Sequence, residues 1–255
     1  MKTLVFYSFK GGVGRSLSLV NTAFHLSHSE GQRVGVVDLD VEACGLSQIF
    51  RVGVPEGRDL LTLINPRHRD LTQLEEFVLP LRFGSKAKPR LFLLPCVPDV
   101  AQLNQVSWNL ATQHFLANEL LPAFGRLYEL DFLLIDARSG LSESATLALK
   151  QGNIEVLTCR LDGQNRYGMK RLVTMCRAVG KPFRVLAVGC PCGYEPYLRR
   201  FEKGIGAKVD YVVPYDPRLY FDEFIISKTI PRSRISKIYQ TMAQEFCRID
   251  ANEGR

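Results

Sequence analysis

The feature that most constrains the fold of this chain is an alternation of short apolar, β-branched segments with longer amphipathic ones. Such alternation is typical of repeated βα units, whose parallel strands are buried on both faces. The expected strands are residues 4–8, 34–37, 91–94, 132–135, 154–158, 184–188 and 211–213. The expected helices are residues 16–28, 101–120, 143–150, 167–178 and 234–248. The pattern predicts an α/β fold with one doubly wound, mostly parallel sheet flanked by helices.

Length and composition favour a single domain over residues 1–255. The chain has 255 residues, of which 46% are hydrophobic and 23% charged, as in ordinary globular proteins. No internal repeat, low-complexity segment or long linker divides it. The least regular stretch, about residues 52–88, has turn-forming Pro and Gly around two short expected helices. We expect this stretch to contact a partner or to move.

The strongest motif, FKGGVGRS at residues 9–16, follows the first expected strand and leads directly into a helix. Glycines in this context allow backbone N–H groups to converge on an anion at the positive end of the helix. The residues expected to bind nucleotide phosphates are Gly11, Gly12, Val13, Gly14, Arg15 and Ser16. The Ser16 hydroxyl is in the position that presents an oxygen to Mg²⁺. A bare glycine turn is the alternative.

The Lys-Gly-Gly-x-Gly core resembles the deviant Walker A motif of the ParA/MinD family of P-loop ATPases. The resemblance implies ATP and Mg²⁺ as ligands, slow hydrolysis, and a homodimer that ATP closes. It also implies that Lys10 reaches across this dimer to the partner's phosphates. Phe9 and Arg15 depart from the general P-loop pattern, which has glycine and lysine at these positions. Arginine keeps the positive charge and can donate two hydrogen bonds to phosphate oxygens, so we expect nucleotide binding to be retained. The alternative is a nucleotide-binding module with little or no hydrolysis.

Carboxylates follow two of the expected strands. Asp38 and Asp40 lie two residues apart and point to one side of an extended chain, at the edge of the sheet where ligands bind. Asp136 ends an apolar strand in the manner of a Walker B element, which supplies a carboxylate near Mg²⁺. The resemblance implies that Asp40 orients or activates the attacking water and that Asp38, Asp136 and Ser16 surround the metal. Glu42 either extends this set or is a solvated loop carboxylate.

Arg138 follows the second acidic strand end in the sequence Ala-Arg-Ser-Gly. A cation at the edge of a γ-phosphate site stabilises transferring charge, which gives Arg138 a candidate catalytic role. An ion pair with Asp136 or Asp40 would use the same geometry, and both interpretations stay open.

The turn after the last expected strand resembles the V-P-x-D turn that lines the base pocket in the family. Pro214, Tyr215 and Asp216 are therefore candidates for contact with adenine or ribose. The asparagine that reads the base in the family is missing, because Gly189 and Cys190 follow the preceding strand. A preference for adenine over guanine thus rests on the resemblance alone.

The net charge of +7 is concentrated in the C-terminal part. Residues 1–150 hold 15 Lys and Arg against 15 Asp and Glu, whereas residues 151–255 hold 18 against 11. This asymmetry indicates a polyanionic partner. By resemblance the partner is DNA held without sequence preference, and the candidate residues are Lys170, Arg171, Arg199, Arg200, Lys203, Arg232, Arg234 and Lys237. The alternative is a solvated positive surface, with a protein activator or cargo as the partner.

Two further expectations concern location. No apolar run approaches the roughly 18 residues needed to span a bilayer, so we expect a cytoplasmic protein without a stable membrane anchor. The apolar face of the expected helix 234–248 is predicted to pack against the sheet rather than a membrane. The seven cysteines form no CxxC pair and are expected to be reduced, which argues against a shared iron–sulfur cluster.

Overall fold

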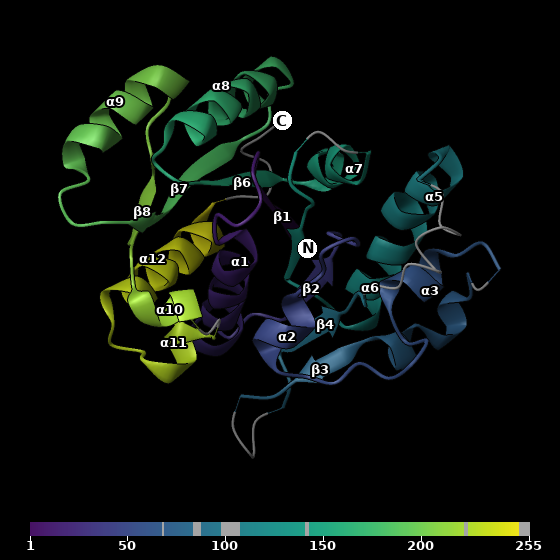
Figure 1. Ribbon diagram of the computed structural model, residues 1–255. Helices are drawn as coiled ribbons and strands as arrows, with labels where there is room; N and C mark the ends of the chain where they lie inside the picture. The colour runs from purple at the N-terminus through teal and green to yellow at the C-terminus, as the bar shows by residue number, and fades with distance from the viewer. Residues whose placement is uncertain (68, 84–87, 98–107, 141–142, 222–223, 250–255) are drawn as a thin grey trace.

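A computed structural model describes residues 1–67, 69–83, 88–97, 108–140, 143–221 and 224–249. Its core is an eight-stranded sheet in the order β3-β4-β2-β5-β1-β6-β7-β8 (Figure 1). All neighbouring strands are parallel except β3 and β4, which are antiparallel. The strands are β1 (Lys2–Tyr7), β2 (Val34–Asp38), β3 (Leu79–Leu81), β4 (Leu91–Leu94), β5 (Phe132–Asp136), β6 (Ile154–Cys159), β7 (Phe183–Cys190) and β8 (Tyr211–Pro214). The predicted fold class is confirmed.

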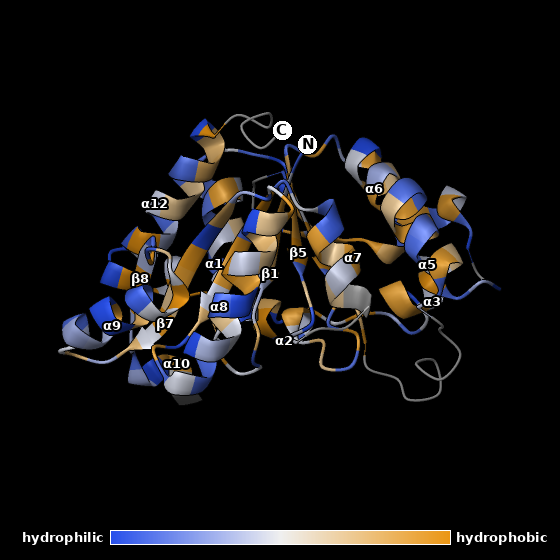
Figure 2. Cartoon of the chain, turned by 90° about the horizontal axis from the view of Figure 1, so that it is seen from above, coloured by the Kyte–Doolittle hydropathy of each residue, from blue (hydrophilic) through white to orange (hydrophobic). Residues whose placement is uncertain are grey.

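Helices cover both faces of the sheet and bury its apolar side chains in two clusters. On one face lie α1 (Arg15–Phe24), the π-helical turn η1 (His25–Ser29), α2 (Leu46–Phe50), α11 (Ile226–Thr229) and α12 (Arg234–Arg248). On the other lie α3 (Leu60–Ile64), the 3₁₀ segment η2 (Leu71–Phe77), α5 (Leu110–His114), η3 (Phe115–Leu120), α6 (Leu121–Leu127), α7 (Glu143–Gln151), α8 (Gly163–Ala178) and α9 (Glu195–Ile205). The short helix α10 (Pro217–Phe221) follows β8. Hydrophobic residues gather along the strands between these layers (Figure 2).

All seven expected strands are present, with ends that shift by one or two residues. Four expected helices correspond to α1 with η1, α7, α8 and α12, and the two short helices of residues 52–88 are α3 and η2. The expected helix 101–120 begins in residues outside the described part, and its described portion continues through α5, η3 and α6 to Leu127. The sequence analysis missed β3, α9 and the short helices α2, α10 and α11.

Helix α12 was predicted to pack its apolar face against the sheet. Ser233 caps the helix by accepting a hydrogen bond from the backbone N–H of Ser236, which satisfies one of its free first-turn donors. Its apolar face is buried in the cluster that it shares with α1, and the two helices lie side by side in Figure 1. This face is thus covered by the sheet layer, as predicted. Within the described residues, no helix combines the length and apolar character needed to cross a membrane.

Candidate functional site

The glycine-rich loop leaves the carboxyl end of β1, at the centre of the sheet, and leads into α1. Gly12 and Gly14 have φ values of 69° and 85°, in the left-handed region that favours glycine. A side chain at Gly14 would also meet Val188 of β7, whose Cγ1 lies 3.0 Å from an ideal Cβ position. Gly14 is the N-cap of α1, and no described side chain caps the helix there. The free N–H groups of the first turn are therefore available to an anion.

Phe9 replaces the first glycine of the general motif and has a packing role. Its ring lies directly against the backbone of α8 at Gly168, where any Cβ would collide with it. It also makes an edge-to-face contact with Tyr167, with ring centroids 6.4 Å apart. Phe9 therefore fixes the start of the loop to helix α8.

Arg15, the second departure from the motif, is turned toward carboxylates. Its Nη2 lies 2.6 Å from Oδ2 of Asp40, and its Nε donates to Oδ1 of Asp136. The Arg15 side chain is 8% exposed, and the side chains of Asp40 and Asp136 are 12% and 1% exposed. Burial would lower the pKa of Arg15, but the ion pairs with Asp136 and Asp40 outweigh it and raise this pKa. The sequence analysis expected the Arg15 guanidinium to bind phosphate oxygens. In the structure it instead bridges the carboxylates of Asp40 and Asp136.

Asp38 lies next to Asp136 across the β2–β5 register and is 1% exposed. Its Oδ1 accepts the backbone N–H of Asp40 at 3.2 Å, and its Oδ2 accepts those of Gly45 and Leu46 at 3.1 and 3.2 Å. Burial raises the pKa of Asp38 well above its ordinary value, and the neighbouring Asp136 carboxylate raises it further. Asp38 thus holds the loop that carries Asp40 against the start of α2.

The residues expected around Mg²⁺ can be tested against this arrangement. Oxygen ligands suit Mg²⁺, and the Ser16 hydroxyl lies close enough to Asp136 to lower the pKa of this carboxyl, so the chemical types are right. However, Arg15 is paired with both Asp136 and Asp40, and Asp38 is engaged by three backbone amides. Within the described residues, no group of three or more His, Cys, Asp or Glu side chains is arranged to hold a metal ion. In this conformation the carboxylates do not fit a divalent cation.

Two other cations border the loop. Arg138 forms an ion pair with Glu42, which is neither of the two partners considered from the sequence. Both groups are partly exposed. Lys10 is exposed, and within the described part of the chain its ammonium has no ion-pair partner. The structure therefore leaves Lys10 accessible to a ligand or to another protein molecule.

A cavity of about 460 Å³ lies over this loop. It is lined by the loop, by the segment after β2 and by the turn after β5, which are far apart in sequence. The lining residues are Ser8, Gly11, Gly12, Gly14, Arg15, Ser16, Leu17, Asp40, Glu42, Ala43, Gly45, Ile49, Arg138 and Ser139. The structure thus brings the loop, Asp40 and Arg138 into one cavity, with Asp136 and Asp38 buried beneath it.

A second cavity, of about 210 Å³, adjoins the first and shares Gly12, Gly14 and Leu17 with it. The predicted base-contact residues Pro214, Tyr215 and Asp216 line it. The remaining lining residues are Val13, Arg160, Val188, Gly189, Val213, Leu219 and Tyr239. Its mixture of apolar walls and a few polar groups is typical of a pocket for a small organic ligand.

Two features of this second cavity extend the sequence analysis. Asp216 is held by Arg218, whose Nη2 and Nε lie 2.6 and 2.9 Å from its carboxylate oxygens, and this ion pair lowers the pKa of Asp216. Arg160 was missed, although it directly follows β6, the strand next to β1. Its position after a strand that neighbours the phosphate loop is the signal that would have found it.

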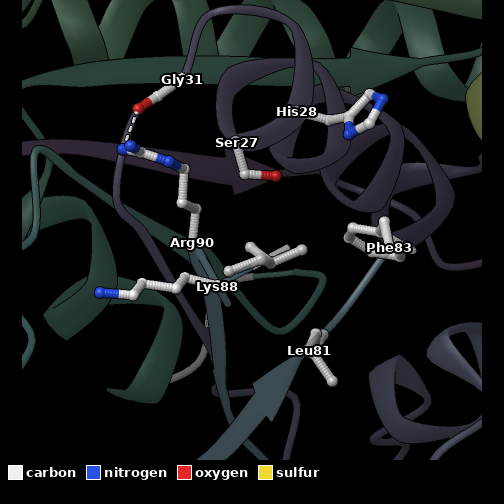
Figure 3. Close-up of a pocket in the computed structure, with 8 residues that line it drawn as sticks. Ser27, His28, Gly31, Leu81, Phe83, Lys88 and Arg90 are labelled. Atoms are coloured by element: carbon white, nitrogen blue, oxygen red, sulfur yellow. Dashed lines mark hydrogen bonds between the residues drawn. The ribbon is translucent and has the colours of Figure 1, made fainter. Parts of the chain in front are cut away.

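A third cavity, of about 420 Å³, lies at the opposite end of α1, near β3 and β4. Figure 3 shows His28, Phe83, Lys88 and Arg90 around it, with Arg90 bonded to the carbonyl oxygen of Gly31 at 2.6 Å. None of its lining residues belongs to the loop or to the acidic strand ends. It is separate from the cavity over the glycine-rich loop, which we call the phosphate cavity below because that loop has the backbone of an anion site.

The comparisons with known proteins agree with this geometry. The ParA family, described as NUBPL iron-transfer P-loop NTPase, matches residues 1–84, which include the glycine-rich loop and Asp40. No curated protein matches the chain in sequence.

Solved structures match nearly the whole chain. A ParA family ATPase from Chlorobium tepidum TLS is 20% identical, with a TM-score of 0.77 and coverage of 95% of this chain and 98% of that chain. Pyrococcus horikoshii MinD, solved with Mg-ADP, is 17% identical, with a TM-score of 0.75 and coverage of 97% and 96%. Cyanothece McdA, solved with ATP, is 18% identical, with a TM-score of 0.74 and coverage of 98% and 97%. The chain thus has the fold of the ParA and MinD P-loop ATPases, and the resemblance predicted from its motifs is confirmed.

Proposed function

We propose that this protein is an ATP-dependent switch that dimerises when it binds ATP, hydrolyses it slowly and positions or regulates a partner. The observation that carries the proposal is the pair of adjoining cavities over the uncapped start of α1. One is lined by the backbone of the glycine-rich loop, which suits phosphates, and the other has the mixed apolar and polar walls that suit a base. An extended nucleotide would contact Gly12, Gly14 and Leu17, which line both cavities.

ATP is the proposed nucleotide because proteins of the same fold bind adenine nucleotides, as the MinD and McdA structures show for those proteins. The exposed ammonium of Lys10 supports the proposed homodimer, since it is free to reach the phosphates held by a second molecule. ATP then shifts the population toward the dimer through contacts that ADP lacks. The proposed setting is the cytoplasm, consistent with seven free cysteines.

Asp40 is the proposed residue that orients the attacking water, and Arg138 is the candidate cation beside the transferred phosphate. Both line the phosphate cavity. A second candidate function, nucleotide binding with little or no hydrolysis, is favoured by the ion pair between Arg15 and Asp40. A carboxylate engaged by a guanidinium is a weaker base toward water, so this pairing slows or abolishes turnover.

The proposed function is tested by measuring ATP affinity, phosphate release and molecular mass in solution on the same preparation. Wild-type protein is expected to bind ATP, to form dimers with ATP but not ADP, and to release phosphate slowly. Asp40→Ala should bind ATP, release less phosphate and accumulate as dimer. Glu75→Ala, which removes an exposed carboxylate of η2, is the matched control. Wild-type turnover in Asp40→Ala would remove Asp40 from the mechanism, and failure of the wild type to bind ATP would refute the proposal.

The proposed partner includes duplex DNA, held through phosphates without sequence preference. All eight candidate residues are exposed. The structure divides them into a group on α8 and α9 (Lys170, Arg171, Arg199, Arg200 and Lys203) and a group at α12 on the opposite face of the sheet (Arg232, Arg234 and Lys237). In an ATP-bound dimer, two weak patches would act together and raise the apparent affinity.

DNA binding is tested with ATP, ADP or no nucleotide at two salt concentrations. The expected result is binding that is strongest with ATP and falls by about 0.9 log units of affinity per log unit of salt for each neutralised phosphate. Reversing the α8–α9 charges with Arg199→Glu and Arg200→Glu should abolish binding, whereas Arg232→Glu and Arg234→Glu distinguish the contribution of the other face. Absent or nucleotide-independent binding would leave a protein activator or cargo as the partner.

A further inference from the structure

A cation of the protein itself, the Arg15 guanidinium, bonds to carboxylates at the floor of the phosphate cavity. Three carboxyl groups, of Asp38, Asp40 and Asp136, lie at the ends of the neighbouring strands β2 and β5. The Arg15 guanidinium bridges Asp40 and Asp136, and it comes from the residue directly after the helix N-cap. It therefore lies where the strand-end carboxylates of a P-loop protein face a divalent cation.

Arg15 and a divalent cation exclude one another at this position. A guanidinium does not lose its proton in proteins, so its charge is permanent. A divalent cation placed on the same buried carboxylates would be repelled by it at short range, where the surroundings screen charge poorly. For the metal to enter, Arg15 would have to leave Asp136, which is 1% exposed, and Asp40, which is almost as buried.

The site retains other means of holding phosphates. The N–H groups at the start of α1 have no described side-chain cap, and Lys10 and Arg138 border the loop. The positive end of the helix suits the charge of a nucleotide that arrives without metal, and in the proposed dimer Lys10 of the second molecule adds a cation. Arg15 is therefore not required as a phosphate ligand.

We propose that Arg15 takes the place of Mg²⁺ in this site, so that the protein binds nucleoside triphosphate in its metal-free form. This inference rests on the proposed function, because it specifies the form of the nucleotide that the site binds. It also explains why hydrolysis would be slow, since the cation beneath the phosphates is monovalent.

The test is calorimetric titration with AMPPNP in excess Mg²⁺ and in EDTA at constant ionic strength. For the wild type we expect dissociation constants within about threefold of each other. For Arg15→Lys, whose flexible ammonium can turn to the phosphates and free the carboxylates, we expect Mg²⁺ to strengthen binding by about tenfold or more. Tenfold tighter wild-type binding in Mg²⁺ would overturn the inference and leave the proposed function intact. No wild-type binding in either buffer would instead refute the proposed function.

A second measurement needs no nucleotide. Arg15→Gln removes the guanidinium but leaves both carboxylates, so Mg²⁺ alone should raise its melting temperature while leaving that of the wild type unchanged. Arg184→Gln is the matched control, because Arg184 pairs with Glu245 at 2.7 Å away from the site, and no Mg²⁺ effect is expected there. Equal Mg²⁺ effects in the wild type and Arg15→Gln would contradict the inference. If Arg15→Gln does not fold, the wild-type affinities in Mg²⁺ and EDTA decide the matter.

Discussion

Asp136 and Glu155 are buried carboxyl groups on the two strands that flank β1, at opposite ends of the sheet. At the carboxyl end, Asp136 accepts from the Arg15 guanidinium. At the amino end, neither carboxylate oxygen of Glu155 has a hydrogen-bond partner among the described residues. Lys181 is near enough to act on Glu155 electrostatically, but its ammonium is hydrogen-bonded to the carbonyl oxygens of Lys150 and Gly152.

The difference shows two ways of accommodating a buried acid. Burial raises the pKa of Glu155 well above its ordinary value, which favours the protonated, neutral form of this group. Burial also raises the pKa of Asp136, but Arg15 acts against that shift and favours the carboxylate. The Arg15 guanidinium thus favours a charged carboxylate at the end of the sheet that faces the cavity over the glycine-rich loop. At the amino end, no such cation among the described residues bonds to Glu155, and burial favours its neutral form.

The largest expected effect comes from removing the cation at the carboxyl end. Arg15→Ala leaves the buried carboxylates of Asp40 and Asp136 without their partner, and we expect a loss of about 3–5 kcal/mol in the free energy of unfolding. Urea denaturation at neutral pH measures it, with Arg15→Lys as the variant that keeps the charge. A loss below about 1 kcal/mol would show that the pair is no more important than one at the surface.

An intermediate effect is expected at the amino end. Because the folded-state pKa of Glu155 is raised, the folded protein keeps a proton that the unfolded chain loses above its ordinary pKa, about 4.5. Wild-type stability should therefore fall as pH rises from that value toward the folded-state pKa. Glu155→Gln cannot lose this proton and should gain on the wild type by about 1.4 kcal/mol per pH unit in this window. Parallel stability curves for the two proteins would contradict this explanation.

The smallest effect is expected for the exposed ion pair beside the site. Arg138 and Glu42 are 36% and 52% exposed, so solvent screens their attraction. We expect Arg138→Ala to change the free energy of unfolding by less than about 1 kcal/mol, whatever it does to phosphate release. The same urea titration measures this change, and a loss as large as that of Arg15→Ala would remove the distinction between buried and surface pairs.

Most strands and long helices could be predicted because each has an apolar pattern in the sequence that is typical of a buried strand or of an amphipathic helix. The exceptions have physical reasons. Strand β3 has only three residues with Pro80 in the middle, which is tolerated because it lies at the edge of the sheet. Helix α9 does carry Leu198, Phe201 and Ile205 at helical spacing, but Gly193 and Pro196 at its start are also typical of a turn, so the sequence there favours two structures.

The sequence predicted where the candidate site lies, but not that Arg15 pairs with Asp40 and Asp136. The rule that ligands bind at the carboxyl ends of parallel strands correctly brought Asp38, Asp40 and Asp136 to one edge with the glycine-rich loop. The partners of Arg15 lie 25 and 121 residues away in sequence. Residue type alone makes phosphate and carboxylate equal targets for a guanidinium, and only the sheet order β2-β5-β1, which brings Asp40 and Asp136 beside the loop, separates them.

The most direct test of the central claim is a crystal structure of the wild-type protein grown with AMPPNP and Mg²⁺. We predict that phosphates lie against the start of α1, that Arg15 remains bonded to Asp40 and Asp136, and that no metal ion is coordinated by Ser16. A magnesium ion held by Ser16 and water beside the strand-end carboxylates, with the Arg15 side chain turned onto the phosphates, would contradict it.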